Sequence, residues 1–210
     1  MRNATKVLAA SSVAAGAALA FARYRRWHLR WGATDEEAGR PMVGDELVAR
    51  PQFAPTRAIT IDAPPDAVWP WLVQLGYGRA GWYSYDCLDS LGHGRSADEI
   101  LPDLQDVQVG DVIPMGPVQN DDTVWTVGQL DAPKTMVWSK PAATWAWQLE
   151  ELPEGRTRLV TRVRVHYRAR PTVVSELVLL ELGDFWMMRK ELRSIKERAE
   201  RETRAVAVAV

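Results

Sequence analysis

The sequence predicts an α+β fold in a single domain, and three observations support this prediction. One strand and two helices are expected first, then a run of short strands, and finally one long helix. The connections between the later strands are too short for crossovers, so the sheet should be antiparallel. The chain has 210 residues, which is enough for one domain with a sizeable core and too few for two ordinary domains.

The first part of the body should lead into one strand and one helix. Residues 31–55 are rich in glycine, proline and acidic residues, so we expect an irregular lead-in that could include one short helix. Thr56–Ile61 alternates and is β-branched, which predicts a strand. Asp62–Asp66 then starts a helix that runs to about Leu75, and a second short helix is expected over residues 84–91.

Short alternating segments after residue 110 predict the rest of the sheet. The expected strands are residues 111–114, 123–130, 135–139, 144–152 and 157–168. In the last of these, apolar side chains and Thr161 share one face, whereas Arg158, Arg162 and Arg164 share the other. The sheet should therefore have a core side and a solvent side.

A long helix over residues 172–201 should close the fold, followed by a frayed tail over residues 205–210. Thirty residues at 1.5 Å each give a helix of about 45 Å, which must bury one stripe on the core face of the sheet. A curved sheet wrapped around one helix leaves a cavity, and a cavity is a candidate binding site. The stripe contains Leu177, Met188 and, unexpectedly, the carboxyl group of Asp184.

Charge is distributed unevenly along the chain. The net charge is −1, but the first 30 residues carry six basic residues and no acid, so the remainder carries an excess of seven acids. Within this segment, Val7–Ala22 is uncharged and apolar, which fits an uncleaved membrane anchor, a cleaved signal peptide, or a soluble or peripheral helix. We expect residues 1–30 to be an anchor with residues 31–204 facing the cytoplasm, because the heavier basic flank is C-terminal; export after cleavage is the alternative.

Several segments together resemble the SRPBCC superfamily, the START-like proteins with a helix-grip fold. The resemblance covers about residues 30–200 and rests on Thr56–Trp69 and Glu181–Arg189. Residues 29–34 and 81–86 are similar to one bacterial branch of that superfamily. The resemblance implies a curved antiparallel sheet around the C-terminal helix. Its members include lipid and sterol carriers and polyketide cyclases, so it implies no particular substrate.

Motifs for other chemistries are weak. Gly76–Gly81 matches G-x-G-x-x-G, but it follows a predicted helix rather than a strand, so we interpret it as a loop beside the cavity mouth. The three histidines are far apart and Cys87 is the single cysteine, so we expect no metal site, no cofactor and no internal disulfide. The near-zero net charge argues against a nucleic-acid partner.

Aromatic residues are the strongest candidates for a binding site. The chain has ten tryptophans, of which Trp145 and Trp147 should share a strand face that Trp125 could join. Trp82 and Tyr83 cluster near the second helix. Each ring could also be ordinary core. The full set of candidate ligand-binding residues is Trp82, Tyr83, Trp125, Trp145, Trp147, Leu177, Asp184 and Met188.

The sequence favours a membrane-tethered protein that binds a lipid, isoprenoid or polyketide-like molecule between the sheet and the last helix. The alternative is an enzyme of cyclase, dehydratase or hydrolase type on the same scaffold, with Asp184, Asp86 or Tyr83 as acid or base. A third hypothesis is a structural or regulatory module whose own tryptophans fill the cavity.

Overall fold

The computed structural model describes residues 2–89, 94–167, 181 and 183–209, with the side chains of residues 2–14, 207 and 209 left aside. Its helices are α1 (Arg2–Leu29), α2 (Asp35–Gly39), α3 (Pro65–Val73), α4 (Asp86–Asp89) and α6 (Asp184–Ala209), with 3-10 turns η1 (Asp45–Val48), η2 (Pro102–Leu104) and η3 (Pro153–Gly155). Its strands are β1 (Thr56–Ile61), β2 (Val112–Pro114), β3 (Val124–Asp131), β4 (Thr135–Lys140), β5 (Ala143–Leu152) and β6 (Arg156–Val165).

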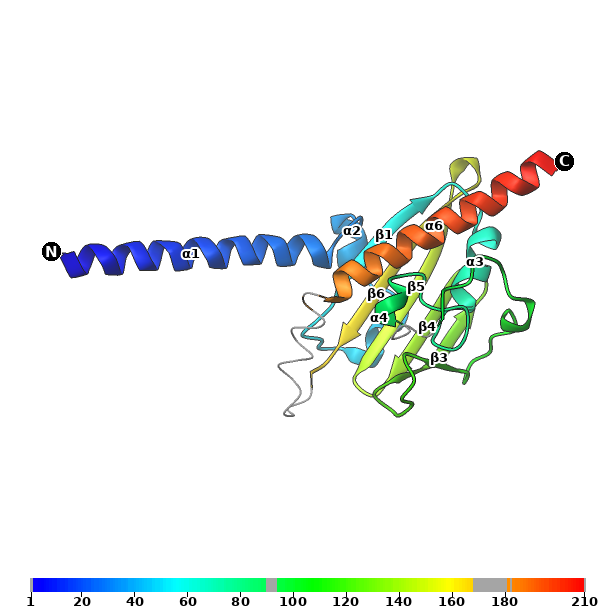
Figure 1. Ribbon diagram of the computed structural model, residues 1–210, viewed down its shortest axis with the longest axis horizontal. Helices are drawn as coiled ribbons and strands as arrows, with labels where there is room; N and C mark the ends of the chain where they lie inside the picture. The colour runs from blue at the N-terminus through cyan, green and yellow to red at the C-terminus, as the bar shows by residue number, and fades with distance from the viewer. Residues whose placement is uncertain (1, 90–93, 168–180, 182, 210) are drawn as a thin grey trace.

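Within the described ranges, six strands form one antiparallel sheet in the order β1-β6-β5-β4-β3-β2. Each of the last four strands is joined to its neighbour by a short turn, whereas β1 pairs with β6 and lies at the edge opposite β2, the next strand in the sequence. The predicted α+β class and the antiparallel sheet are therefore confirmed. The curved sheet and α6, which runs obliquely over one face, give the arrangement expected of a helix-grip fold (Figure 1).

The main core lies between the sheet and the helices α3 and α6. Pro65 occupies the first turn of α3, where its missing N–H costs nothing, and Trp71, Leu72 and Val73 are buried. The buried stripe of α6 contains Met188, Leu192, Ile195 and Ala199, and α6 packs against α3 and β1. The stripe predicted for the terminal helix is correct from Met188 onward, whereas residues 172–180, including Leu177, lie outside the described residues.

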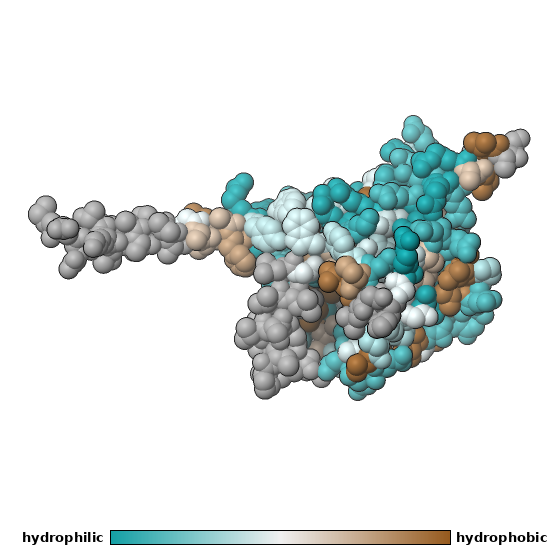
Figure 2. Space-filling view, in the orientation of Figure 1, coloured by the Kyte–Doolittle hydropathy of each residue, from teal (hydrophilic) through white to brown (hydrophobic). Residues whose placement is uncertain are grey.

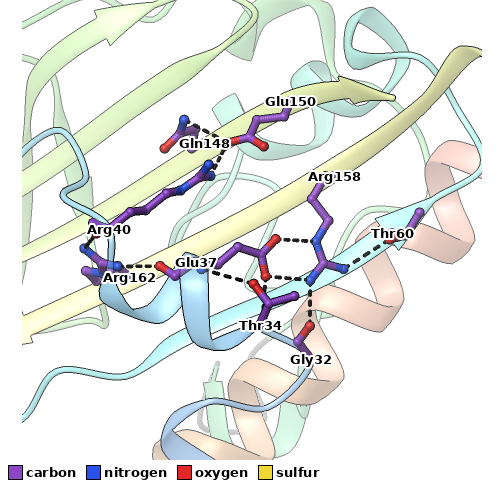
Figure 3. A network of polar contacts seen from close by, with 9 residues as sticks. All are labelled: Gly32, Thr34, Glu37, Arg40, Thr60, Gln148, Glu150, Arg158 and Arg162. Atoms are coloured by element: carbon purple, nitrogen blue, oxygen red, sulfur yellow. Dashed lines mark hydrogen bonds and ion pairs between the residues drawn. The ribbon is translucent and has the colours of Figure 1, made fainter. Parts of the chain in front are cut away.

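The second face of the sheet is covered, so the prediction of a solvent-exposed face is wrong. Residues of the lead-in lie on it: Glu37 accepts hydrogen bonds from Arg158 Nε and Nη2 at 2.7 and 2.8 Å (Figure 3). Arg162 donates to Asp45 Oδ2 at 2.6 Å and to the Glu37 carbonyl at 2.7 Å. The alternating arginines of β6 predicted that this face is exposed to solvent. The acidic residues of the lead-in form ion pairs with these arginines, and a small apolar cluster around Val137 and Val160 is buried on the same face.

The N-terminal segment is a helix, but none of the helices in the described part of the chain combines the length and apolar character that crossing a membrane requires. The uncharged stretch of this helix is short, is half alanine, and has basic residues on both sides. The expected anchor over residues 1–30 stays a prediction. Figure 1 shows α1 extending away from the body.

The last turns of α1 are fixed to Glu181 and to the first turn of α6. Arg25 donates hydrogen bonds to both carboxyl oxygens of Glu181, from Nε at 2.9 and 3.0 Å and from Nη2 at 2.7 Å. The Trp27 ring contacts Phe185 with 4.8 Å between centroids. His28 is fully buried, and burial lowers its pKa, so the imidazole is neutral at pH 7. At the other end of the chain, α6 continues through Ala209, into the segment expected to be a tail.

Candidate functional site

Five tryptophans from four segments pack together on the face of the sheet that also carries α6. We call Trp82, Trp125, Trp138, Trp145 and Trp147 the tryptophan cluster; each is at most 7% exposed. The Trp145 ring is stacked on Trp82 and on Trp147, with 5.7 and 5.0 Å between centroids. Trp138 meets Trp145 edge-on at 5.3 Å. The cluster therefore joins β3, β4 and β5 to the loop that contains Trp82.

The indole N–H groups of this cluster differ in their hydrogen bonding. Trp145 Nε1 donates to Thr161 Oγ1 at 2.9 Å. Among the described residues, the buried Nε1 atoms of Trp125, Trp138 and Trp147 have no hydrogen-bond partner. Buried polar groups in proteins are nearly always paired, and an unpaired one costs about 1–3 kcal/mol. Three such donors in one cluster suit a bound molecule whose oxygen atoms accept hydrogen bonds.

A hollow of about 230 Å³ lies beside Trp82. The loop that forms part of its wall is closed by paired backbone hydrogen bonds between Gly76 and Gly81, at 3.1 Å in each direction. A Cβ at Gly81, where φ is +83°, would lie 2.7 Å from Ser96 Oγ, so glycine is needed there. The hollow is lined by Tyr77, Gly78, Arg79, Gly81, Trp82, Asp86, Asp89, Gly94, Arg95 and Ser96. The loop follows helix α3, which is no context for dinucleotide binding.

Two carboxyl groups near this hollow have strongly perturbed acidity. Asp89, at the end of α4, lines the hollow, and its Oδ2 is buried without a hydrogen-bond partner in the described ranges. Burial, together with the charge of Asp86, raises the pKa of Asp89 to about 6. A hydrogen bond with Ser84 acts in the opposite direction and lowers this pKa. Glu191 on α6 is 3% exposed, and its Oε1 is equally without a partner there.

The surroundings of Glu191 favour the protonated form of its carboxyl group. Burial raises its pKa well above the ordinary value, and the charges of Asp89 and Asp184 add to this effect, while Arg57 opposes it. The sequence interpretation missed both Glu191 and Asp89. A signal for Glu191 existed, because it lies three residues after Met188 and four before Ile195, and so falls on the buried stripe of the helix.

Tyr83 is a buried residue that hydrogen bonding holds in place. Its hydroxyl accepts a hydrogen bond from Gln74 Nε2 at 2.5 Å, and its ring lies 4.6 Å from the guanidinium carbon of Arg198. Burial raises the pKa of the phenol, so it remains protonated throughout the physiological range. Its backbone φ is +53°, and its N–H donates to Ser96 Oγ at 3.0 Å. These contacts support a structural role for the Tyr83 side chain.

The two other candidate acids are engaged by neighbours. Asp184, which the sequence places on the stripe that faces the core, forms an ion pair with Arg57 of β1, with 2.6 Å between Oδ2 and Nη1. Asp86 accepts hydrogen bonds from the backbone N–H and the hydroxyl of Ser96 at 3.0 and 2.7 Å, which fastens the loop at the hollow. Met188 is 3% exposed and belongs to the core.

A larger hollow of about 470 Å³ lies at another part of the fold, between the start of α3 and the turn that joins β3 to β4. It exposes carboxylates, including Asp66 and Asp131, and lacks the aromatic lining of the tryptophan cluster. Over the residues that the structure describes, no three histidine, cysteine, aspartate or glutamate side chains are arranged to hold a metal ion. The site beside Trp82 is therefore the better candidate for binding an apolar molecule.

The strand order, the curved antiparallel sheet and the position of α6 decide the architecture. This chain has a helix-grip fold. Several solved structures resemble this chain at low sequence identity. The ZhuI aromatase/cyclase of Streptomyces sp. R1128 is 19% identical, with a TM-score of 0.42, and the match covers 73% of this chain and 96% of that chain.

Two further solved structures show the same level of similarity. CalC, a self-sacrificing resistance protein of Micromonospora echinospora, is 12% identical, with a TM-score of 0.41 and coverage of 70% of this chain and 94% of CalC. Protein NE0264 of Nitrosomonas europaea is 11% identical, with a TM-score of 0.44 and coverage of 71% and 96%. No protein-family model and no curated protein sequence matches the chain.

Proposed function

We propose that this helix-grip domain binds an apolar small molecule with one or more rings and oxygen atoms, of lipid, isoprenoid or polyketide type. The observation that carries the proposal is the tryptophan cluster, in which three indole N–H groups have no hydrogen-bond partner among the described residues. Tryptophan offers a large apolar face and one hydrogen-bond donor, so it suits a ligand that combines ring surface with oxygen acceptors. Trp82 links the cluster to the hollow, because its ring packs on Trp145 and also lines the hollow.

Affinity in such a site would come from apolar burial, at roughly 25 cal/mol for each Å² of surface removed from water. The polar groups would orient the ligand, since each hydrogen bond gained replaces one that the ligand made with water. Binding without chemistry suffices for a carrier. An enzyme on the same scaffold would need a free acid or base, and the pairing of Asp184 and Asp86 leaves Asp89 and Glu191 for that role.

Titration calorimetry with 1-tetralone, a two-ring ketone, tests the proposal. We expect saturable binding at one site and about tenfold weaker binding for Trp82→Ala, which removes the ring that joins the hollow to the cluster. Trp186→Ala is the matched control, because Trp186 lies on α6 with 48% of its surface exposed. Lack of saturable binding by the folded wild-type chain, or equal weakening by both variants, would contradict the proposal.

We also propose that α1 brings the domain to an anionic membrane surface, on the cytoplasmic side where such lipids are enriched. The described part of α1 exposes Leu19 and Phe21 at 67% and 53%, followed by the exposed side chains of Arg23, Arg26 and Trp27. Figure 2 shows the hydrophobic atoms of α1 next to the hydrophilic body. Aromatic and basic residues together favour the membrane interface.

Flotation with phosphatidylcholine vesicles, with and without phosphatidylserine, tests this location. We expect the full chain to float with the anionic vesicles and to be released by salt, since the attraction is electrostatic. Arg23→Glu combined with Arg26→Glu should abolish flotation. The same charge reversal at Arg201 and Arg204, at the far end of α6, serves as the control. Equal flotation with neutral vesicles, or loss in both pairs of variants, would be inconsistent with the proposal.

A further inference from the structure

Asp89 lines the hollow beside Trp82, and Glu191 lies on the buried stripe of the last helix. Glu191 comes from α6 and Asp89 from α4, and Asp89 is near enough for its charge to act on Glu191. Each has one buried oxygen without a hydrogen-bond partner among the described residues. A buried carboxylate without a partner is far more costly than a buried carboxylic acid, so this arrangement favours the protonated form.

The neighbouring charged groups do not remove this preference. Arg57 is the cation that acts on Glu191, but its Nη1 is held by Asp184 at 2.6 Å and its Nε donates to the His28 carbonyl at 3.1 Å. Tyr83, whose acidity Glu191 affects, is neutral. Near Asp89 are the carboxylate of Asp86, itself bonded to Ser96, and the hydroxyl of Ser84. Arg79 and Arg95 line the same hollow, and Arg79 donates to the carbonyls of Leu75 and Val73 at 3.0 and 2.8 Å. In both cases, a neutral acid can donate a hydrogen bond into the interior.

We propose that the carboxyl groups of Glu191 and Asp89 select ligands that carry a carbonyl oxygen, by donating a hydrogen bond to that oxygen. This inference rests on the proposed ligand-binding function and gives it a substrate class. The indole N–H groups of Trp125, Trp138 and Trp147, which have no partner among the described residues, are also hydrogen-bond donors. Together with the two carboxylic acids, they make this interior richer in hydrogen-bond donors than in acceptors. A ketone or quinone fits such a site, whereas a hydrocarbon of the same shape gains nothing from these donors.

The selection should depend on pH, and Asp89 sets the direction. Asp89 is protonated, and therefore a donor, below its pKa of about 6, and it loses the proton as the pH rises through that value. A bound carbonyl oxygen stabilises the protonated form, so affinity for the ketone should fall above pH 6. Burial raises the pKa of Glu191 well above the ordinary value, so this second donor also favours its protonated form. Part of the selection should therefore persist at higher pH.

Paired probes test the inference: 1-tetralone and tetralin share two fused rings, and only the first has a carbonyl oxygen. We expect the wild-type chain to bind 1-tetralone about tenfold more tightly than tetralin at a pH well below 6. Glu191→Leu should remove most of this preference, whereas Glu191→Gln keeps an N–H donor and most of the preference. Asp89→Asn should flatten the dependence on pH. Glu197→Leu, on the exposed side of the same helix, is the control.

Each outcome separates this inference from the proposed function. Equal affinity for both probes would overturn the selection and leave ligand binding intact. Absence of binding by either probe would overturn both proposals. A preference that survives Glu191→Leu and Asp89→Asn would overturn the role of these two residues. Because leucine replaces an unpaired buried acid, Glu191→Leu should melt at the same temperature as the wild type or higher, which guards against loss of binding through unfolding.

Discussion

Arg57 and Asp184 form a buried ion pair across the contact between β1 and α6, with Arg57 Nη1 2.6 Å from Asp184 Oδ2. The Arg57 side chain is 2% exposed and that of Asp184 is 16% exposed. Arg57 Nε also donates to the carbonyl of His28 at the end of α1. One arginine therefore joins α1, the first strand and the last helix, which are far apart in the sequence.

Asp184→Asn should destabilise the domain by about 3 kcal/mol, because it leaves the buried Arg57 guanidinium without its counter-charge. Arg57→Met combined with Asp184→Leu should recover most of that loss, since two apolar side chains leave no charge unpaired. Urea unfolding of the two variants and the wild type measures both effects. A double variant that is less stable than Asp184→Asn would contradict a simple pairing role.

Glu37 should make the stability of the domain depend on pH. Hydrogen bonding to Arg158 lowers the pKa of Glu37 to about 2, from an ordinary value of 4.5, and hydrogen bonds from Thr34 lower it further. Since the folded-state pKa is the lower one, the stabilisation is present above about 4.5 and is lost as the pH falls toward 2. Its size should be about 2 kcal/mol.

Unfolding free energies at about pH 7 and about pH 3 measure this dependence on Glu37. Glu37→Gln should lose stability at the higher pH and change less between the two. Glu36→Gln is the control, because Glu36 is adjacent and exposed. If both variants kept the full wild-type change with pH, another carboxyl group would be responsible.

Gly32 is required where the lead-in crosses β1. Its φ is +75°, and an added Cβ would lie 1.9 Å from the carbonyl oxygen of Ala58. That backbone atom is held by the sheet, so Gly32→Ala should cost about 2 kcal/mol or more. Gly39→Ala should change stability by less than about 0.5 kcal/mol, because a Cβ at Gly39 meets nothing within 4 Å. Thermal melting of both variants checks the difference.

Local patterns predicted much of the fold and fewer of the long-range contacts. Alternation and turn residues located β1 and the later strands, because side-chain period and turn chemistry are local properties. The covering of the outer face by the lead-in could not be predicted in this way. It depends on Glu37 reaching Arg158 across 121 positions of sequence, and the irregular composition of the lead-in carries no periodicity.

The candidate site could be predicted only in part, because local patterns indicate some of its residues and long-range contacts position the others. The sequence predicts Trp145 and Trp147 on one face, because residues two apart on a strand point to the same side of the sheet. In the structure their rings are stacked. The pairing of Asp184 with Arg57 could not be foreseen, since it depends on where the last helix crosses the first strand. Glu191 was overlooked among charged neighbours, although its spacing from Met188 placed it on the buried side.

Nuclear magnetic resonance of the indole N–H groups tests ligand binding at the tryptophan cluster. The ten tryptophans give one indole N–H signal each, and Trp→Phe variants assign them. Addition of 1-tetralone should shift the signals of Trp125, Trp138 and Trp147, whose N–H groups have no partner among the described residues, and leave the exposed Trp27 and Trp186 unchanged. Shifts confined to Trp27 and Trp186, or no shift at any concentration of ketone, would contradict a binding site inside the helix-grip domain.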